Sequence, residues 1–157
     1  MRVRALQPAD RERLSDFIKE KWGSELQAFR GRVVRPADYP GFVAEEADTW
    51  VGVATLEFDG GDCEIVTLNG DPRGRGIGTA LVEAVVEHAR SRGCRRVRVT
   101  TTNSNLDALR FYMRRGFRLV ELRVGAVDRS RELKTGIPET GAYGIPMHDE
   151  LELEMVL

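Results

Sequence analysis

The residues whose types and spacing most clearly suggest chemistry lie in a short glycine-rich segment, residues 73–78. Three glycines stand two residues apart and two arginines alternate with them: Arg73, Gly74, Arg75, Gly76 and Gly78. Glycine lets the backbone approach a ligand closely, and a helix that starts here would add N–H groups and the positive end of its dipole. Guanidinium groups can fork around phosphate oxygens. The segment therefore predicts a binding site for a phosphate or pyrophosphate group.

Two common phosphate-binding motifs do not fit this segment. A P-loop ends in Gly-Lys-Ser/Thr, whereas this segment ends in Gly78-Thr79 without a lysine. A dinucleotide-binding loop needs Gly-x-Gly-x-x-Gly, but Thr79 stands three residues after Gly76 and Leu81 stands three residues after Gly78. No acidic residue ends the next expected strand, within residues 95–102. A glycine-rich turn that binds no ligand remains the simpler alternative.

The distribution of charge is uneven along the chain. The sequence has 24 basic and 25 acidic residues. Residues 73–118 contain eleven arginines and three acidic residues, a net charge of +8, and the other 111 residues have a net charge of −9. One contiguous third of the chain is therefore suited to an anion. The alternative is an ordinary solvated surface in an arginine-rich protein, since the chain has 21 Arg and 3 Lys.

Length and composition predict one globular domain over residues 1–157. The chain is 41% hydrophobic and 31% charged, which is typical of a folded protein and not of a disordered one. No apolar run is long enough to span a membrane, and the start of the chain lacks a signal-peptide core. Cys63 and Cys94 cannot make a disulfide framework or a four-ligand zinc site. We expect a cytoplasmic protein without a metal, a membrane partner or a nucleic-acid partner.

Apolar periodicity predicts an α/β, or α+β, domain with a mixed sheet. A first helix should bury Leu14, Phe17 and Ile18 and end near Gly23. A short helical stretch is expected around residues 24–29, and a long polar loop over 126–148. Strands are expected at 42–46, 49–58, 64–68, 97–101, 117–124 and 150–157, with a hairpin turn at Ala47-Asp48. Two more helices should run from Ile77 to Gly93, with Ile77, Ala80, Leu81, Ala84, Val85, His88 and Ala89 buried, and from the Asn103-Ser104 cap to Arg115.

Two segments together resemble the GNAT superfamily of acyl-CoA-dependent N-acyltransferases. Residues 73–78 fit its Arg/Gln-x-x-Gly-x-Gly/Ala loop. Residues 105–117 look like its Asn-x-x-Ala-x-x-Phe-Tyr-x-x-x-Gly-Phe segment, in the right order along the chain. The resemblance covers residues 62–124, and the expected elements outside that range fit as well.

The resemblance implies a fold and a cosubstrate. The fold is a mixed, mostly antiparallel sheet of about seven strands, splayed into a V and flanked by about four helices. The cosubstrate is acetyl-CoA, and its pyrophosphate would lie on Arg73, Gly74, Arg75, Gly76, Ile77, Gly78 and Thr79. The backbone of Leu68 and Asn69 would pair with the pantetheine arm, and Asn105, Ala108, Phe111 and Tyr112 would flank the arm and the thioester.

Glu64 is the candidate general base. An amine must lose its proton before it attacks a thioester, and a lysine-like amine with a pKa of about 10.4 is almost wholly protonated at pH 7. Glu64 lies on the strand that leads to the glycine-rich segment, where a charge on a buried face needs a reason, and some members of the family use a glutamate there. The alternatives are a carboxylate that faces solvent at a sheet edge or one that pairs with an arginine.

Tyr112 is the candidate general acid. The thiolate that leaves coenzyme A needs a proton, and Tyr112 matches the family's acid tyrosine. The alternative is a core aromatic residue beside Phe111. The expected activity is acetyl transfer to a primary amine by direct attack on the thioester. The alternative is a non-catalytic acyl-CoA-binding module of the same fold.

Other polar residues have weaker functional interpretations. His88 is expected in the core, and His148 lacks metal-ligand spacing. The segment Trp22–Glu25 and the residues 126–148 are expected near the acceptor, whose identity the sequence does not give. The acidic residues of the last strand region could attract a cationic amine or protect the sheet: Asp149, Glu150, Glu152 and Glu154. A homodimer is possible.

Overall fold

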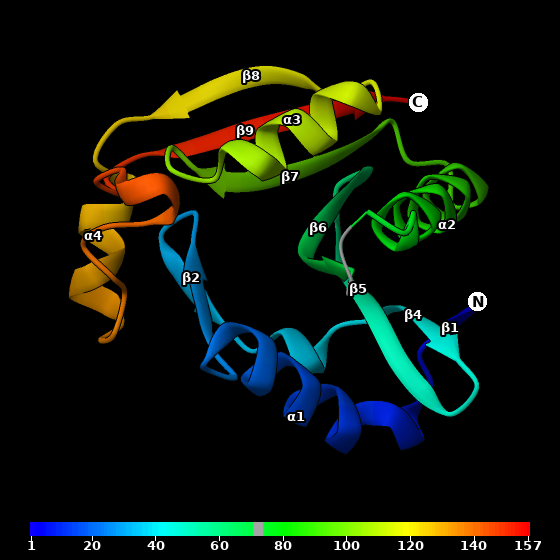
Figure 1. Ribbon diagram of the computed structural model, residues 1–157. Coiled ribbons are helices and arrows are strands. Elements are labelled where there is room, and N and C mark those ends of the chain that lie inside the picture. Colours follow the sequence, from blue (N-terminus) through cyan, green and yellow to red (C-terminus); the bar gives the residue numbers. More distant parts are fainter. Residues whose placement is uncertain (71–73) are drawn as a thin grey trace. The chain divides into compact units, whose positions relative to one another are not determined.

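The computed structural model describes residues 1–70 and 74–157 (Figure 1). Its strands are β1 (Arg2–Ala5), β2 (Gln27–Phe29), β3 (Arg32–Val34), β4 (Gly41–Glu46), β5 (Thr49–Asp59), β6 (Asp62–Gly70), β7 (Arg96–Thr102), β8 (Arg118–Arg123) and β9 (Glu150–Val156). Its α-helices are α1 (Arg11–Trp22), α2 (Ile77–Ser91), α3 (Leu106–Arg114) and α4 (Ala126–Leu133). Within the described residues, no helix is long and apolar enough to cross a membrane.

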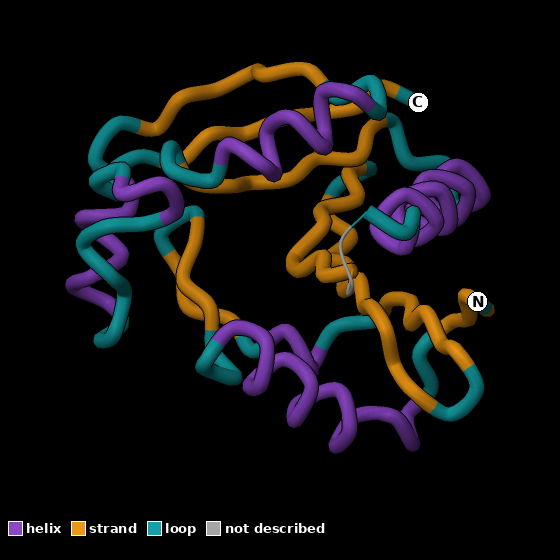
Figure 2. The backbone as a smooth tube through the Cα atoms, viewed as in Figure 1, coloured by secondary structure: helices purple, strands orange, loops and turns teal. Residues whose placement is uncertain are grey.

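Seven strands form one sheet in the order β1-β4-β5-β6-β7-β9-β8, and β2 and β3 form a separate two-stranded sheet. Figure 2 colours the strands orange and the helices purple. The pairs β1–β4, β4–β5, β5–β6 and β8–β9 are antiparallel. The chain divides into two compact units. One comprises Met1–Glu25, Arg35–Val97 and Val156–Leu157, and the other comprises Leu26–Val34 and Arg98–Met155.

In the first unit, α1 packs on the β4–β5 hairpin. Leu14, Phe17 and Ile18 are buried in one cluster with Val43 and Val53, as the periodicity predicts. The helix ends at Gly23, which adopts a positive φ of 77°. The hairpin turns at Ala47 and Asp48 as expected, with Ala47 at φ 53°.

The helix α2 also belongs to the first unit, and its buried face is rotated from the predicted one. The buried residues are Ile77, Leu81, Val82, Val85, Val86 and Ala89, whereas Ala80, Ala84 and His88 are only partly buried. The prediction was wrong at these positions because the strands that α2 packs against, β4, β5 and β6, decide which flank of a mainly apolar helix is enclosed. His88 packs edge-on against the rings of Phe42 and Phe58, each with a centroid distance of 5.6 Å.

The second unit contains two elements that the sequence analysis assigned wrongly. Residues 27–29 form a strand and not a helix, because they pair with β3 around a turn in which Arg30 and Gly31 have positive φ. Residues 126–148 contain the helix α4, which Gly125 caps and which buries Ala126, Val127 and Ser130 on one face. The helix lies beside β2 (Figure 1). The i, i+1, i+4 spacing of those residues was the available signal, in a stretch otherwise rich in polar residues.

Candidate active site

The glycine-rich segment leads directly into α2, as predicted. Gly74 and Gly76 adopt φ values of 86° and 79°, which residues with a Cβ rarely adopt. No atom lies within 4 Å of a Cβ built at either position, so the backbone conformation and not crowding requires glycine. Both residues are exposed. The segment therefore presents backbone to solvent at the start of a helix.

The start of α2 has the backbone geometry of an ordinary helix N-terminus. Gly76 is the N-cap, and the Ala80 N–H donates the first helical hydrogen bond to the Gly76 carbonyl at 3.0 Å. Helices begin with N–H groups that have no acceptor inside the helix, and these point away from its start. Ile77, also predicted to bind here, is only 2% exposed. Arg73, also predicted to bind here, lies outside the described residues.

A further glycine, Gly70 at the end of β6, was missed by the sequence analysis as a site residue. A Cβ on Gly70 would lie 2.8 Å from the Gly78 nitrogen, which is too close for any side chain. The strand and the helix therefore approach each other through two glycines. The Asn69-Gly70 pair preceding the loop was the available signal.

The Arg75 side chain forms an ion pair within the protein. Its Nη2 donates to Oε2 of Glu46 at the end of β4, and the two side chains form an ion pair. The hydrogen bond from Arg75 holds the pKa of Glu46 below its usual value. A phosphate at the loop would compete with this carboxylate for Arg75.

The neighbouring strands β5 and β6 carry a row of polar side chains on one face. Glu64 lies directly opposite Glu57, Thr67 opposite Thr55, and Asn69 opposite Val53. Residues directly opposite each other in an antiparallel pair lie on the same face of the sheet. Val53 belongs to the cluster packed against α1, so Asn69 lies on the face of the sheet that α1 covers. We call Asn69, Thr67, Thr55, Glu57 and Glu64 the polar row.

The polar row is largely enclosed. Glu64 is 1% exposed, so the alternative of a carboxylate facing solvent at a sheet edge is wrong. Thr55 and Thr67 are buried, and their Oγ1 atoms share a hydrogen bond of 2.8 Å. The buried Oδ1 of Asn69 has no hydrogen-bond partner among the described residues. Because buried polar atoms are normally paired, this oxygen is available to a ligand that donates a hydrogen bond.

The second predicted segment forms α3, in the second unit. Asn105 caps this helix, since its Oδ1 accepts the Ala108 N–H at 3.2 Å. Tyr112 is 5% exposed, and its ring packs edge-to-face on Phe111 and Phe117 with centroid distances of 5.2 Å. Burial raises the pKa of Tyr112 above its ordinary value. The hydroxyl group therefore stays protonated at neutral pH.

The remaining polar candidates have structural partners. Burial raises the pKa of the Cys63 thiol to about 12, so this thiol is not a nucleophile at neutral pH. Glu150 and Glu152 are buried and each accepts a hydrogen bond of 3.0 Å from Arg123. His148 Nδ1 lies 3.0 Å from an oxygen of Asp128 on α4. Asp149 accepts the Gly125 N–H at 2.8 Å, so three of the four acidic residues expected to attract an amine have partners inside the fold.

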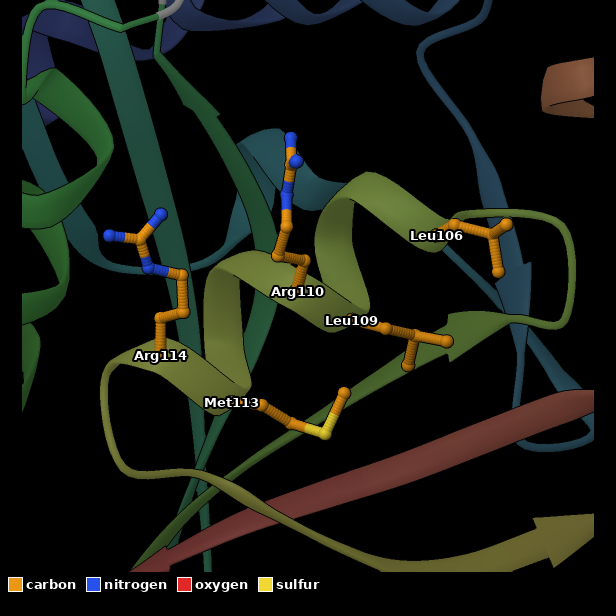
Figure 3. A pocket seen from close by; sticks show the side chains of 5 residues that line it. All are labelled: Leu106, Leu109, Arg110, Met113 and Arg114. Carbon is orange, nitrogen blue, oxygen red and sulfur yellow. The ribbon is translucent and has the colours of Figure 1, made fainter.

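A pocket of about 490 Å³ lies on α3 (Figure 3). Its lining residues are Leu106, Leu109, Arg110, Met113 and Arg114. None of the five was a predicted site residue, although they recur at three- and four-residue spacing along the helix.

Comparisons with known proteins agree with this arrangement. The family model described as Acetyltransferase (GNAT) family matches residues 5–117. The protein YdhI of Bacillus subtilis (strain 168) is 37% identical over 145 residues, which cover 92% of this chain and 91% of YdhI.

Solved structures share the fold. The IAA acetyltransferase from Bacillus cereus ATCC 14579 is 23% identical with a TM-score of 0.71, covering 99% of this chain and 100% of that one. A GNAT family acetyltransferase from Elizabethkingia anophelis, with acetyl-CoA bound, is 21% identical with a TM-score of 0.72, covering 99% and 97%. The fold predicted from the two sequence segments is therefore confirmed. Because the family model spans most of the chain and YdhI matches nearly all of it, the chain belongs to the Acetyltransferase (GNAT) family.

Proposed function

We propose that this protein transfers an acetyl group from acetyl-CoA to a primary amine by direct attack of the amine on the thioester. The observation that carries the proposal is the exposed pair Gly74 and Gly76, both with positive φ, at the N-terminus of α2 in a chain of this family. Backbone N–H groups at a helix start suit the pyrophosphate of the cosubstrate. The structure from Elizabethkingia anophelis, which has acetyl-CoA bound, supports this choice of cosubstrate.

The polar row supports the chemical step. An amine nitrogen that attacks the thioester carbonyl forms a C–N bond, and the C–S bond then breaks. Glu64 takes the amine proton, directly or through a water molecule, and Tyr112 gives a proton to the departing sulfur of coenzyme A. Asn69 Oδ1 would accept a hydrogen bond from an amide N–H of the pantetheine arm, which would satisfy this buried oxygen.

The direct test is release of free thiol from acetyl-CoA across a panel of amines: amino acids, aminoglycosides, polyamines and peptides with free N-termini or lysines. Amine-dependent thiol release is the expected result. Binding of coenzyme A without thiol release for any amine would instead favour the non-catalytic acyl-CoA-binding alternative. Failure to bind coenzyme A would overturn both.

The ion pair of Arg75 gives a prediction about cosubstrate binding. Arg75→Gln should weaken coenzyme A binding about tenfold, because charge-assisted hydrogen bonds to a phosphate contribute about 1.5–3 kcal/mol. Glu46→Gln removes the competing carboxylate and should leave the affinity unchanged or increase it. Isothermal titration calorimetry at low ionic strength measures both. Equal weakening by the two variants would mean that the ion pair only supports the fold.

A further inference from the structure

The strand β8 lies at an edge of the seven-stranded sheet and presents a continuous apolar surface. Within residues 1–70 and 74–157, β8 pairs with β9 alone. Leu119, Val120 and Leu122 are 49%, 48% and 55% exposed, and Val124, directly after the strand, is 69% exposed. Single exposed apolar residues are ordinary, but four within six consecutive positions mark an interaction surface. The open backbone groups of an edge strand can also pair with a further strand.

The other edge of the same sheet, β1, differs in both respects. It has four residues, and Val3, its one large apolar residue, is only partly exposed. Arg4 of this strand forms ion pairs of 2.7 Å with Asp10 and 3.0 Å with Glu45. Short length and charged side chains are the usual protection of a sheet edge against further pairing. The apolar surface of β8 is therefore a property of this strand and not of sheet edges in the protein.

A bulge in β8 places two opposite charges on one face of the strand. Arg118 lies directly opposite Glu154 of β9, and after a register shift between Leu119 and Glu121, Glu121 lies opposite Glu152. Glu152 and Glu154 are two residues apart in β9 and share a face. Arg118 and Glu121 therefore share that face too, although residues three apart in a regular strand lie on opposite faces.

The strand β8 is complementary to itself when two copies run antiparallel. A twofold axis between Leu119 and Val120 sets Arg118 of each copy opposite Glu121 of the other, and Leu119 of each copy opposite Val120 of the other. Opposite charges and apolar pairs stabilise an antiparallel ladder at directly opposed positions. A twofold axis perpendicular to the sheet keeps every residue on its own face. The bulge permits this register, because it brings Arg118 and Glu121 to the same face.

The neighbouring symmetric registers lack this match. An axis through Val120 would set Leu119 opposite Glu121, an apolar side chain against a charge. An axis through Glu121 would set that carboxylate opposite its own copy. An axis between these two residues would set Arg118 opposite Arg123. Because like charges at opposed positions destabilise an antiparallel pair, the sequence of β8 favours one register with a second copy of the same strand.

We propose that β8 is a homodimer interface, at which two copies pair antiparallel with Arg118 of each opposite Glu121 of the other. In the single chain, Glu121 forms an ion pair of 3.1 Å with Arg123. Arg123 also bonds the buried Glu150 and Glu152, so it keeps two partners when Glu121 turns to the second copy. The pairing would cover the apolar surface of β8 and join the two sheets at this edge. The inference does not depend on acetyl transfer.

The test is the oligomeric state, measured by sedimentation equilibrium over a concentration series at low ionic strength. The wild-type protein should have twice the mass of one chain. Arg118→Glu and Glu121→Arg each create two like-charged pairs and should raise the dissociation constant of the dimer at least tenfold. An equimolar mixture of the two variants should form the dimer again, because both cross-strand pairs then have opposite charges. The double variant Arg118→Glu/Glu121→Arg should dimerise by itself for the same reason.

The matched control is Arg2→Glu, which reverses an exposed charge on the other edge strand and should leave the dimer unchanged. A wild-type protein that stays monomeric throughout the series overturns the proposal. A dimer that neither single charge reversal weakens excludes β8 as its interface. Loss of the dimer in both single variants, without recovery in their mixture, overturns the register. Thermal unfolding shows that each variant is folded, and amine-dependent thiol release by a monomeric protein would leave the acetyltransferase proposal intact.

Discussion

Glu64→Gln is expected to lower kcat by about 10²–10⁴-fold at neutral pH while leaving the dissociation constant of coenzyme A unchanged. The amide has nearly the shape of the carboxylate but cannot take a proton from the attacking amine. The loss should shrink as the pH rises toward the pKa of the amine, because a growing fraction of the amine is then already neutral. Initial rates of thiol release across a pH series, with saturating acetyl-CoA, measure both effects.

The control for this variant is Glu57→Gln on β5. Glu57 lies directly opposite Glu64, so the control removes one negative charge from the same face of the sheet. We expect it to change kcat much less than Glu64→Gln does. A Glu64→Gln protein with wild-type kcat and normal coenzyme A binding would show that the buried carboxylate serves the fold and not the reaction. An equal loss of kcat in both variants would mean that the negative charge on this face of the sheet matters, and that Glu64 does not act as the general base.

Tyr112→Phe is expected to lower kcat by about 10²-fold or more, with unchanged coenzyme A affinity and nearly unchanged thermal stability. The ring contacts to Phe111 and Phe117 remain, so the packing of this buried side chain is kept. Removing the hydroxyl should therefore change the stability of the fold little, whereas it removes the proton donor for the departing sulfur. Steady-state rates and thermal unfolding measure the two properties separately.

A second aspect of this prediction concerns pH. Burial raises the pKa of Tyr112, so the phenol stays protonated through the mildly alkaline range, and the wild-type kcat should show no alkaline decline from this group. Tyr39→Phe, a substitution of the same kind in the other compact unit, is the matched control. Wild-type turnover by Tyr112→Phe would leave Tyr112 as a core aromatic residue only.

Features encoded by a few consecutive residues could be predicted from the sequence. The conformation of Gly74 and Gly76, the start of α2 after them and the hairpin turn at Ala47 each depend on local backbone preferences. The cap of α3 by Asn105 is likewise local, because the side chain bonds an N–H three residues ahead. The errors at residues 27–29 and 126–133 arose where local preference was weak and tertiary packing decided the element.

The sequence by itself determined the glycine-rich loop before α2 and the family, because the glycine spacing and the 105–117 segment are contiguous patterns whose backbone geometry depends on nearby residues. Only the tertiary structure decided which partner each charged side chain has. Strand register places Glu57 opposite Glu64, the end of β4 brings Glu46 to Arg75, and the position of β9 lets Arg123 engage Glu150. These pairings join residues far apart in the chain, and a charge has a defined partner only once strand pairing fixes which side chains share a face.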